Sequence, residues 1–336
     1  MTKRTSILIV FFLFFSCSKR EKDISSFESP EDSLSIFLAK ANETNLSLDA
    51  KLNYNRKALD ILLNQKNDSI NRVNLFRVAN RFYNMNNWSD YKSTVLLILN
   101  QSEEKSDYQS SAKAYTYLGD YYSSQSIVDS AFFFYFKAEK IYLKLNDKFN
   151  LAKTRLNKAN LQYSESDFLG SEVAVFNSLR VINGLDSKEI FYDSYNLLGA
   201  VYNEIGEYNK ALEFHLKALS ISKDKEIPSV YQSRATSLNN IGYVYQNLKN
   251  YQKAQEYYQE GLRQKNLKYD KPSLYAMLLD NLAYSRFRLR EDDELPGLFL
   301  KSLKLRDSLK LTSGIVANKI HLSEYYSYKN DDAKAV

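Results

Sequence analysis

Apolar and small residues recur along this chain at helical spacing, in pairs of segments joined by short polar turns. The clearest pair runs over 195–202 and 208–219, with a polar turn at 204–207. Further pairs cover 115–122 with 131–138 and 238–245 with 251–262. Apolar positions three and four residues apart share one face of a helix, because a helical turn takes about 3.6 residues. The pattern therefore predicts consecutive antiparallel helix pairs.

A small or polar residue recurs at the eighth position of each predicted pair. These positions are Ala39, Ala79, Gly119, Asn160, Gly199, Gly242, Ala283 and Ser323, at intervals of 40, 40, 41, 39, 43, 41 and 40 residues. A small side chain here lets the two helices of a pair approach closely. Because a lone pair cannot bury both of its faces, we expect each pair to pack on the next.

The residues over 195–219 and 238–262 resemble the tetratricopeptide repeat. That family has small residues at positions eight and twenty and aromatic residues at eleven and twenty-four. The interval here exceeds the usual repeat of about 34 residues, which implies longer helices, as in the branch typified by the kinesin light chain. The resemblance implies an all-α fold, a right-handed superhelical solenoid of antiparallel helix pairs. We expect seven repeats and a truncated eighth over 29–336.

The composition agrees with long helices and short connections. The chain has 9 glycines and 4 prolines in 336 residues, whereas average usage would give about 24 and 17. So few turn formers argue against β-sandwiches, β-barrels and doubly wound sheets. Pro296 falls inside a predicted second helix, so we expect that helix to start late, with Leu295 and Phe299 still facing inward.

The first seventeen residues have the three-part plan of an export signal. Lys3 and Arg4 precede the apolar run 7–15, and Ser16-Cys17 follows. The apolar run rises only about 14 Å as a helix, less than half of a hydrocarbon core of roughly 30 Å. The small residue before the only cysteine resembles the lipobox of bacterial lipoproteins. We predict a signal peptide over 1–16 and lipidation of Cys17, with ordinary cleavage or retention as an anchor as the alternatives.

A polar tether is expected over 17–28, before a helix that begins near Pro30. The lipoprotein resemblance implies an exported protein held on a membrane in the periplasm or cell envelope. Removal of Lys3 and Arg4 lowers the net charge from +6 to +4, which is too small to indicate a nucleic-acid partner. Lys137, Lys140 and Lys144 lie on one helical face, which we interpret as a solvated face.

The sequence offers little material for enzyme chemistry. After the N-terminal segment it has no cysteine and only two histidines, His215 and His321. His215 takes the aromatic position twenty-four, so we interpret it as a packing residue. His321 and Glu324 lie one helical turn apart, but a metal site needs three or four ligands. We therefore expect no catalytic residue, no metal and no cofactor.

The family resemblance implies a concave groove lined by the first helix of each pair. Its positions five, six and nine supply candidate peptide-binding residues: Asn157, Asn196, Asn239, Asn240, Tyr243, Asp280, Asn281 and Tyr284. Asparagine donates and accepts hydrogen bonds, so a ladder of amides suits the backbone of an extended peptide. The alternative is that the asparagines satisfy neighbouring turns within the stack. The lysine that clamps a C-terminal carboxylate in chaperone-binding members is absent.

These observations leave two hypotheses for the function. The first is a non-enzymatic scaffold that binds a protein or an extended peptide in the groove. The second is the sensory region of a signalling protein, because exported arrays of this kind resemble those of Bacteroidetes histidine kinases and helix-turn-helix regulators. The sequence ends at Val336 soon after the start of a predicted helix, which leads us to expect a truncated product or the front part of a longer chain.

Overall fold

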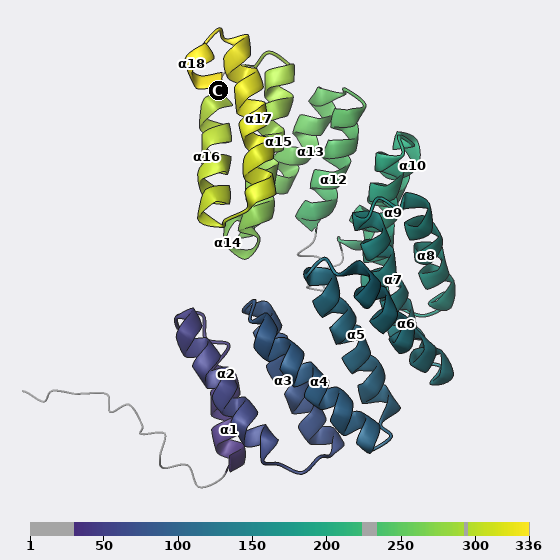
Figure 1. Ribbon diagram of the computed structural model, residues 1–336. Coiled ribbons are helices and arrows are strands. Elements are labelled where there is room, and N and C mark those ends of the chain that lie inside the picture. The colour runs from purple at the N-terminus through teal and green to yellow at the C-terminus, as the bar shows by residue number, and fades with distance from the viewer. Residues whose placement is uncertain (1–29, 224–233, 292–294, 336) are drawn as a thin grey trace, which may run out of the picture. The chain divides into compact units, whose positions relative to one another are not determined.

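The computed structural model describes residues 30–223, 234–291 and 295–335, and every regular element in these ranges is an α-helix (Figure 1). The all-α fold predicted from the sequence is confirmed. The predicted signal peptide, Cys17 and the tether lie outside the described residues. None of the described helices is both long and apolar enough to cross a membrane.

The chain divides into two compact units, and the first ends at Gln101. Its helices are α1 (Pro30–Lys40), α2 (Leu48–Leu63), α3 (Ser69–Asn84) and α4 (Trp88–Glu104), the last of which continues past the boundary. α2 packs against both α1 and α3. The buried Asn55 ties α2 to α3, since its Nδ2 donates to the carbonyl oxygen of Val78 over 3.0 Å.

The second unit, Ser102–Val336, is a row of helix pairs. The first helices are α5 (Tyr108–Ser124), α7 (Lys148–Ser164), α9 (Lys188–Glu204), α12 (Arg234–Asn247), α15 (Pro272–Arg288) and α17 (Thr312–Tyr328). Their partners are α6 (Val128–Lys144), α8 (Phe168–Val181), α10 (Tyr208–Ile221), α13 (Tyr251–Leu262), α16 (Leu295–Ser308) and α18 (Asp332–Ala335). The short helix α14 (Leu267–Asp270) precedes α15.

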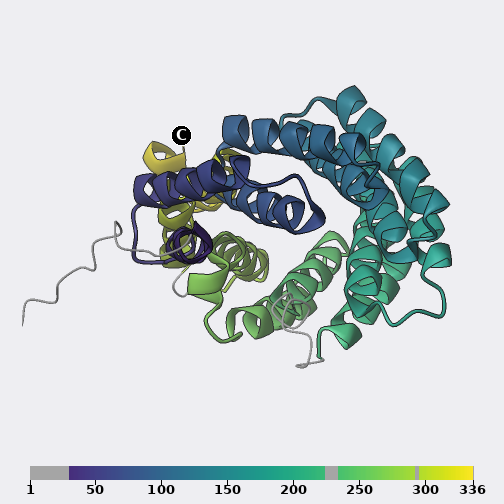
Figure 2. The same ribbon diagram turned by 90° about the horizontal axis from the view of Figure 1, so that it is seen from below.

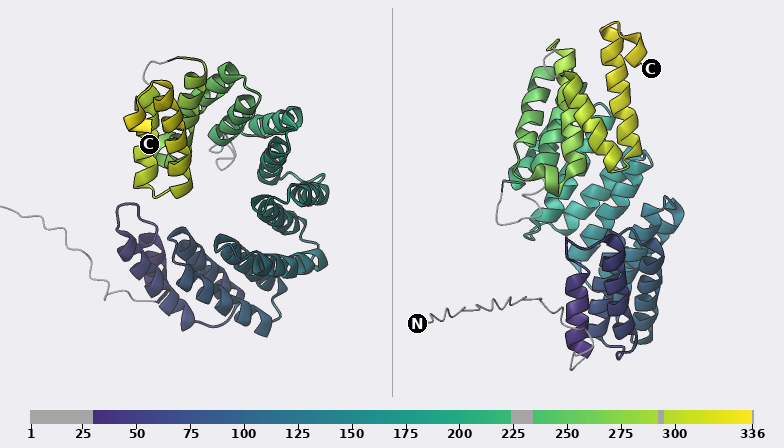
Figure 3. Two further views of the ribbon diagram at one scale, coloured as in Figure 1. Left: turned by 45° about the horizontal axis from the view of Figure 1, so that its top comes forward. Right: turned by 90° about the vertical axis from the view of Figure 1, so that its left-hand side faces the viewer.

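The pairs of the second unit follow one another around an arc (Figures 2 and 3). First helices of neighbouring pairs, such as α7 and α9, touch one another, whereas extensive contacts between neighbouring second helices are absent from the described part of the unit. The first helices therefore form the inner side of the arc and the second helices its outer side. This is the solenoid arrangement predicted from the repeat.

The helices of a pair meet where a small residue faces a larger one sixteen positions later. A Cβ atom added to Gly119 would lie 2.4 Å from the Tyr135 ring, and one added to Gly242 would lie 2.5 Å from the Tyr258 ring. A Cβ on Gly199 would lie 2.5 Å from the His215 ring. Elsewhere the pairs are Ala159 with Val175 and Ala283 with Phe299, all fully buried. The eighth position is thus small because the facing side chain occupies the space.

The structure corrects the predicted eighth position in two of the helix pairs. In α7 the buried small residue is Ala159, and Asn160 is exposed. The helices α5, α7 and α9 begin at 108, 148 and 188, an interval of 40 residues each time, so the prediction at Asn160 was one residue out of register. Ala39 is exposed near the end of the short helix α1, so it does not serve as a contact residue.

Short turns reverse the chain with few glycines. A residue in the left-handed region, with φ between about 53° and 65°, follows many of the helices: Asn86, Ser106, Ser126, Asn146, Ser166, Lys249, Arg290, Lys310 and Asn330. Glycine normally favours this conformation, and asparagine tolerates it. Most of these turns thus need no glycine. Three of the glycines, Gly119, Gly199 and Gly242, lie instead at close contacts between helices.

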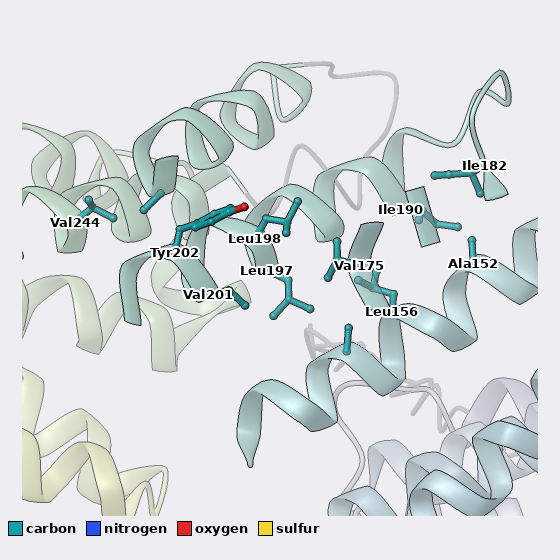
Figure 4. Packing of buried hydrophobic residues seen from close by; sticks show 12 residues of the cluster. Ala152, Leu156, Val175, Ile182, Ile190, Leu197, Leu198, Val201, Tyr202 and Val244 are labelled. Carbon is teal, nitrogen blue, oxygen red and sulfur yellow. The ribbon is translucent and has the colours of Figure 1, made fainter. Parts of the chain in front are cut away.

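The hydrophobic core of the second unit lies within and between the pairs (Figure 4). Leu156, Val175, Leu198 and Val201 belong to one cluster that joins α7, α8 and α9. At the other end of the unit, α16 begins at Leu295, next to Pro296, and both Leu295 and Phe299 are fully buried. The expected inward positions of Leu295 and Phe299 are confirmed, whereas the expected late start depends on residues 292–294, which lie outside the described residues.

Candidate functional site

A cavity of about 430 Å³ opens on the inner side of the second unit, between α7, α9 and the start of α12. We call it the inner pocket. Its lining combines apolar side chains with amides and charges: Phe149, Lys153, Leu156, Asn157, Asn160, Tyr163, Glu189, Ile190, Tyr192, Asp193, Asn196, Leu197, Ala200 and Thr236. Apolar side chains beside convergent polar groups are typical of binding sites, and in this pocket asparagine, threonine and charged residues make up half of the lining.

Two of the predicted groove residues, Asn157 and Asn196, lie in the inner pocket. The Nδ2 of Asn157 donates to Oδ1 of Asp120 over 3.1 Å, and the Tyr135 hydroxyl donates to the same oxygen over 2.7 Å. The Nδ2 of Asn196 donates to the carbonyl oxygen of Tyr192 over 3.1 Å. Both amides are half-buried and held by hydrogen bonds, so they present fixed polar groups to the pocket.

The pocket carries charges of both signs. Glu189 and Asp193 lie one turn apart on α9, and neither has a hydrogen bond or ion pair with another described residue. Asp193 reaches the solvent of the pocket, yet the surrounding protein desolvates its carboxylate. This burial, with repulsion from Glu189, raises the pKa of Asp193 to about 6, although Lys153 and Lys271 oppose the shift. The charged form is therefore poorly compensated and would gain from a cationic group nearby.

Asp120 lies beside the pocket and accepts the hydrogen bond from Asn157. Burial raises the pKa of its carboxyl to about 6, against the effects of the Tyr135 hydroxyl, Lys153 and the Asn157 amide. Two donors and one nearby cation are thus insufficient to offset its desolvation. Asp120 and Asp193 are thus two desolvated carboxyls with raised pKa values, and Lys153 acts against both shifts.

The structure places Asn239 and Asn281 inside the stack. The Nδ2 of Asn281 donates to Oδ1 of Asn239 over 3.0 Å, and both side chains are buried. Asn239 in turn points its Nδ2 at Oδ1 of Asn240 over 3.4 Å. For these two residues the geometry corrects the expectation of an accessible amide ladder and agrees with the alternative, in which the amides satisfy neighbours within the stack.

Asp280 is also removed from the inner surface. It is 1% exposed, and Arg306 Nη1 of α16 lies 3.0 Å from its Oδ2. Its Oδ1 lies 2.8 Å from Asn318 Nδ2 and 3.1 Å from His321 Nδ1, both on α17. Position five of α15 thus faces the next helix pair, so this carboxylate cannot contact a peptide in the structure.

The remaining predicted residues reach solvent outside the inner pocket. Tyr243 is 41% exposed, and Asn240 and Tyr284 are half-buried. The Tyr284 hydroxyl accepts a hydrogen bond from Arg288 Nη1 over 2.9 Å, and its ring centroid lies 4.4 Å from that of His321. The structure therefore gathers two of the eight candidates in one cavity and separates these three from it.

The charged residues of the pocket have a signal in the sequence at a position other than five, six and nine of the repeat. With α7 in its correct register, position two of successive first helices holds Lys113, Lys153, Asp193 and Thr236. Three of these four line the inner pocket. Position two belongs to the groove in the family, but the one-residue error at Asn160 hid its charges in α7.

The two histidines serve the packing. His215 is buried against Gly199, and desolvation lowers its pKa to about 4, so it is neutral at pH 7. His321 contacts Asp280 and Tyr284. Among the described residues, no group of three or more histidine, cysteine, aspartate or glutamate side chains could hold a metal ion.

Two segments of the second unit match family models for the tetratricopeptide repeat, residues 193–224 and 235–266. The chain contains tetratricopeptide repeats. The first match covers most of α9 and all of α10, and the second covers α12 and α13. Both tetratricopeptide repeats have the small eighth residue, Gly199 or Gly242, against the ring of the partner helix.

Solved structures of similar fold extend beyond the two matched tetratricopeptide repeats. The apo form of the quorum sensor NprR from B. thuringiensis has a TM-score of 0.68 at 13% identity, covering 91% of this chain and 84% of its own. Apo RapI has a TM-score of 0.55 at 14% identity, covering 91% and 93%. NprR in complex with its cognate peptide NprX has a TM-score of 0.55 at 16% identity, covering 92% and 86%. No curated protein matches the chain in sequence. At such identities the likeness concerns the fold alone.

Proposed function

We propose that this chain is a non-enzymatic scaffold that binds an extended peptide, or an extended segment of a protein, in the inner pocket. The observation that carries the proposal is the pocket itself, which brings Asn157, Asn196 and the carboxylates of Glu189 and Asp193 together with apolar side chains on the inner side of the unit. The fold supports it, because the NprR structure of similar fold is a complex with a peptide.

The chemistry of the pocket suits a peptide backbone with charged side chains. The fixed amides of Asn157 and Asn196 lie on neighbouring first helices, and each amide can both donate and accept a hydrogen bond. Phe149, which is 42% exposed, offers apolar area beside them, backed by the buried Leu156 and Leu197. Glu189 and Asp193 favour a cationic side chain or an N-terminal ammonium group, and this charge would also lower the pKa of Asp193.

A phage-displayed peptide library tests the proposal. Peptides selected on the wild-type chain should lose about tenfold in affinity for the Asn157→Ala/Asn196→Ala variant, because each lost hydrogen bond contributes about 0.5–1.5 kcal/mol. The matched control is Asn209→Ala, which removes an exposed amide from α10, away from the pocket lining. Titration by fluorescence anisotropy gives the affinities, and circular dichroism checks the helix content. Equal affinities for the double variant and the wild type would move the binding site elsewhere.

We further propose that the protein is exported and held on a membrane through lipidated Cys17. The positively charged start, the apolar run and the small residue before the only cysteine support this. Cells fed a labelled fatty acid should label the wild-type chain and leave Cys17→Ser unlabelled. More than one acyl chain is needed for stable anchoring, at about 0.8 kcal/mol per buried methylene, so Cys17→Ser should also leave the membrane fraction when the membranes are washed at high salt, which screens contacts between surface charges. Label on both chains would refute the lipobox.

A further inference from the structure

The outer side of the second unit exposes large apolar side chains on two neighbouring second helices. Phe133, Phe136 and Leu143 on α6 and Leu169, Val173 and Phe176 on α8 are all exposed, between 40% for Phe176 and 72% for Leu169. We call these six residues the outer apolar patch. Val173 takes the place of Phe133 one repeat later, and Phe176 that of Phe136. The exposure is therefore a repeated feature of this face.

A groove of about 580 Å³ lies between α6, α7 and α8. Phe132 of α6 and the patch members Leu169 and Val173 of α8 line it, together with polar side chains: Lys158, Gln162, Asp167 and Asn177. Each of the two helices thus carries its own exposed apolar face beside the groove. Exposed apolar side chains that gather in this way mark interaction sites on soluble domains.

Basic side chains border the patch toward the C-terminal ends of both helices. Lys137, Lys140 and Lys144 lie on the face of α6 that carries its exposed apolar residues, and Arg180 is exposed near the end of α8. The Lys137 ammonium lies 4.6 Å from the Phe133 ring centroid, and that of Lys140 lies 4.5 Å from the Phe136 centroid. Asp129 and Asp167 are exposed at the N-terminal ends of the helices. The glutamates of the two helices are half-buried and paired: Glu139 with Arg155 and Lys158, and Glu172 with the Tyr202 hydroxyl, which donates to it.

We infer that this face docks on the surface of an anionic lipid bilayer. Phenylalanine and leucine tips set among lysines are the composition of segments that lie in the membrane interface, with the apolar groups among the acyl chains and the cations at the headgroups. A second copy of the chain fits less well, because a two-fold contact through this face would bring its lysines together. The proposal is independent of acylation and of the inner pocket.

A fluorescent probe on the patch tests the inference in the full chain. Cys17 is the only cysteine, so Cys17→Ser/Val173→Cys places a single environment-sensitive fluorophore within the patch. The matched control is Cys17→Ser/Tyr269→Cys, since Tyr269 on α14 is 80% exposed and lies outside the patch. The N-terminal apolar run is common to both chains, so its effect on vesicle binding is the same in both.

Vesicles of phosphatidylcholine with phosphatidylglycerol should shift the emission at position 173 to shorter wavelength and leave position 269 unchanged. Vesicles of phosphatidylcholine alone should have a much weaker effect. Adding Lys137→Gln, Lys140→Gln and Lys144→Gln to the probe chain should weaken the partition by about tenfold or more, because each lysine near an anionic surface strengthens binding several-fold. High salt should act in the same direction.

Three outcomes would overturn the inference. An unchanged spectrum at position 173 would show that the patch does not enter the bilayer, and equal shifts at both positions would show contact without orientation. A shift without vesicles that grows with protein concentration would assign the patch to self-association.

Discussion

Replacing Asp280 by asparagine is expected to lower the free energy of unfolding by about 3–5 kcal/mol. Arg306, only 5% exposed at its side chain, would lose the carboxylate that neutralises it at 3.0 Å, and an uncompensated buried charge is strongly destabilising. Asn318 and His321 would also lose a charged acceptor. Urea denaturation followed by circular dichroism measures the loss. Amide hydrogen exchange should place it in α15, α16 and α17, because each repeat contacts its neighbours only.

Two control variants separate the buried ion pair from charge removal in general. Glu213→Gln breaks an exposed pair with Lys217, in which the side chains are 58% and 45% exposed, and should change the free energy of unfolding by no more than about 0.5 kcal/mol. Asp280→Leu with Arg306→Met removes both buried charges and should recover much of the loss. If Asp280→Asn costs no more than Glu213→Gln, the pair contributes nothing to the stability of these helices.

Asp280 also shows what the sequence could predict and what it could not. The repeat places position five on the inner side of each first helix, and this holds for Asn196, which lines the inner pocket. At Asp280 the same position meets Arg306, which lies 26 residues later on another helix. Nothing in the spacing of residues reveals such a partner. The fold followed from the pattern, whereas the accessibility of each polar side chain depended on its neighbours in space.

The register of α7 was ambiguous in the sequence for a physical reason. Ala159 and Asn160 are adjacent, and either could occupy the small position near the end of the helix. Ala159 is the smaller residue and lies 40 residues from both Gly119 and Gly199, and its packing in the cluster that holds Val175 decides between the two. The same one-residue shift moves Lys153 into position two, so the register error hid the cation that α7 contributes to the pocket. The positions of the binding residues are counted from the small contact residue, so an error of one residue there shifts every predicted binding residue of that helix.

The close contact at Gly242 leads to a prediction in which one substitution has opposite effects at two sites. Gly242→Ala would place a Cβ atom 2.5 Å from the Tyr258 ring. This ring is fully buried between the helices, and its hydroxyl donates a hydrogen bond to Gln246 Oε1 over 3.1 Å. Overpacking of this kind costs about 1–3 kcal/mol, and the gain in helix propensity of about 1 kcal/mol offsets only part of it. Gly297 on α16 is exposed and has no atom within 4 Å of an added Cβ. Gly297→Ala should therefore stabilise the chain by up to about 1 kcal/mol.

A double-mutant cycle identifies the ring of Tyr258 as the cause. Val175 faces Ala159 in the pair of α7 and α8, so Tyr258→Val creates a site that already accepts alanine elsewhere in the chain. Tyr258→Val destabilises on its own, because it removes a buried ring. In that background Gly242→Ala should cost little or stabilise, giving a coupling free energy of about 1–3 kcal/mol between the two positions. Urea denaturation of the four chains supplies the cycle. Additive effects would show that the glycine is required for another reason, and the facing ring would then no longer account for the small eighth position of the repeat.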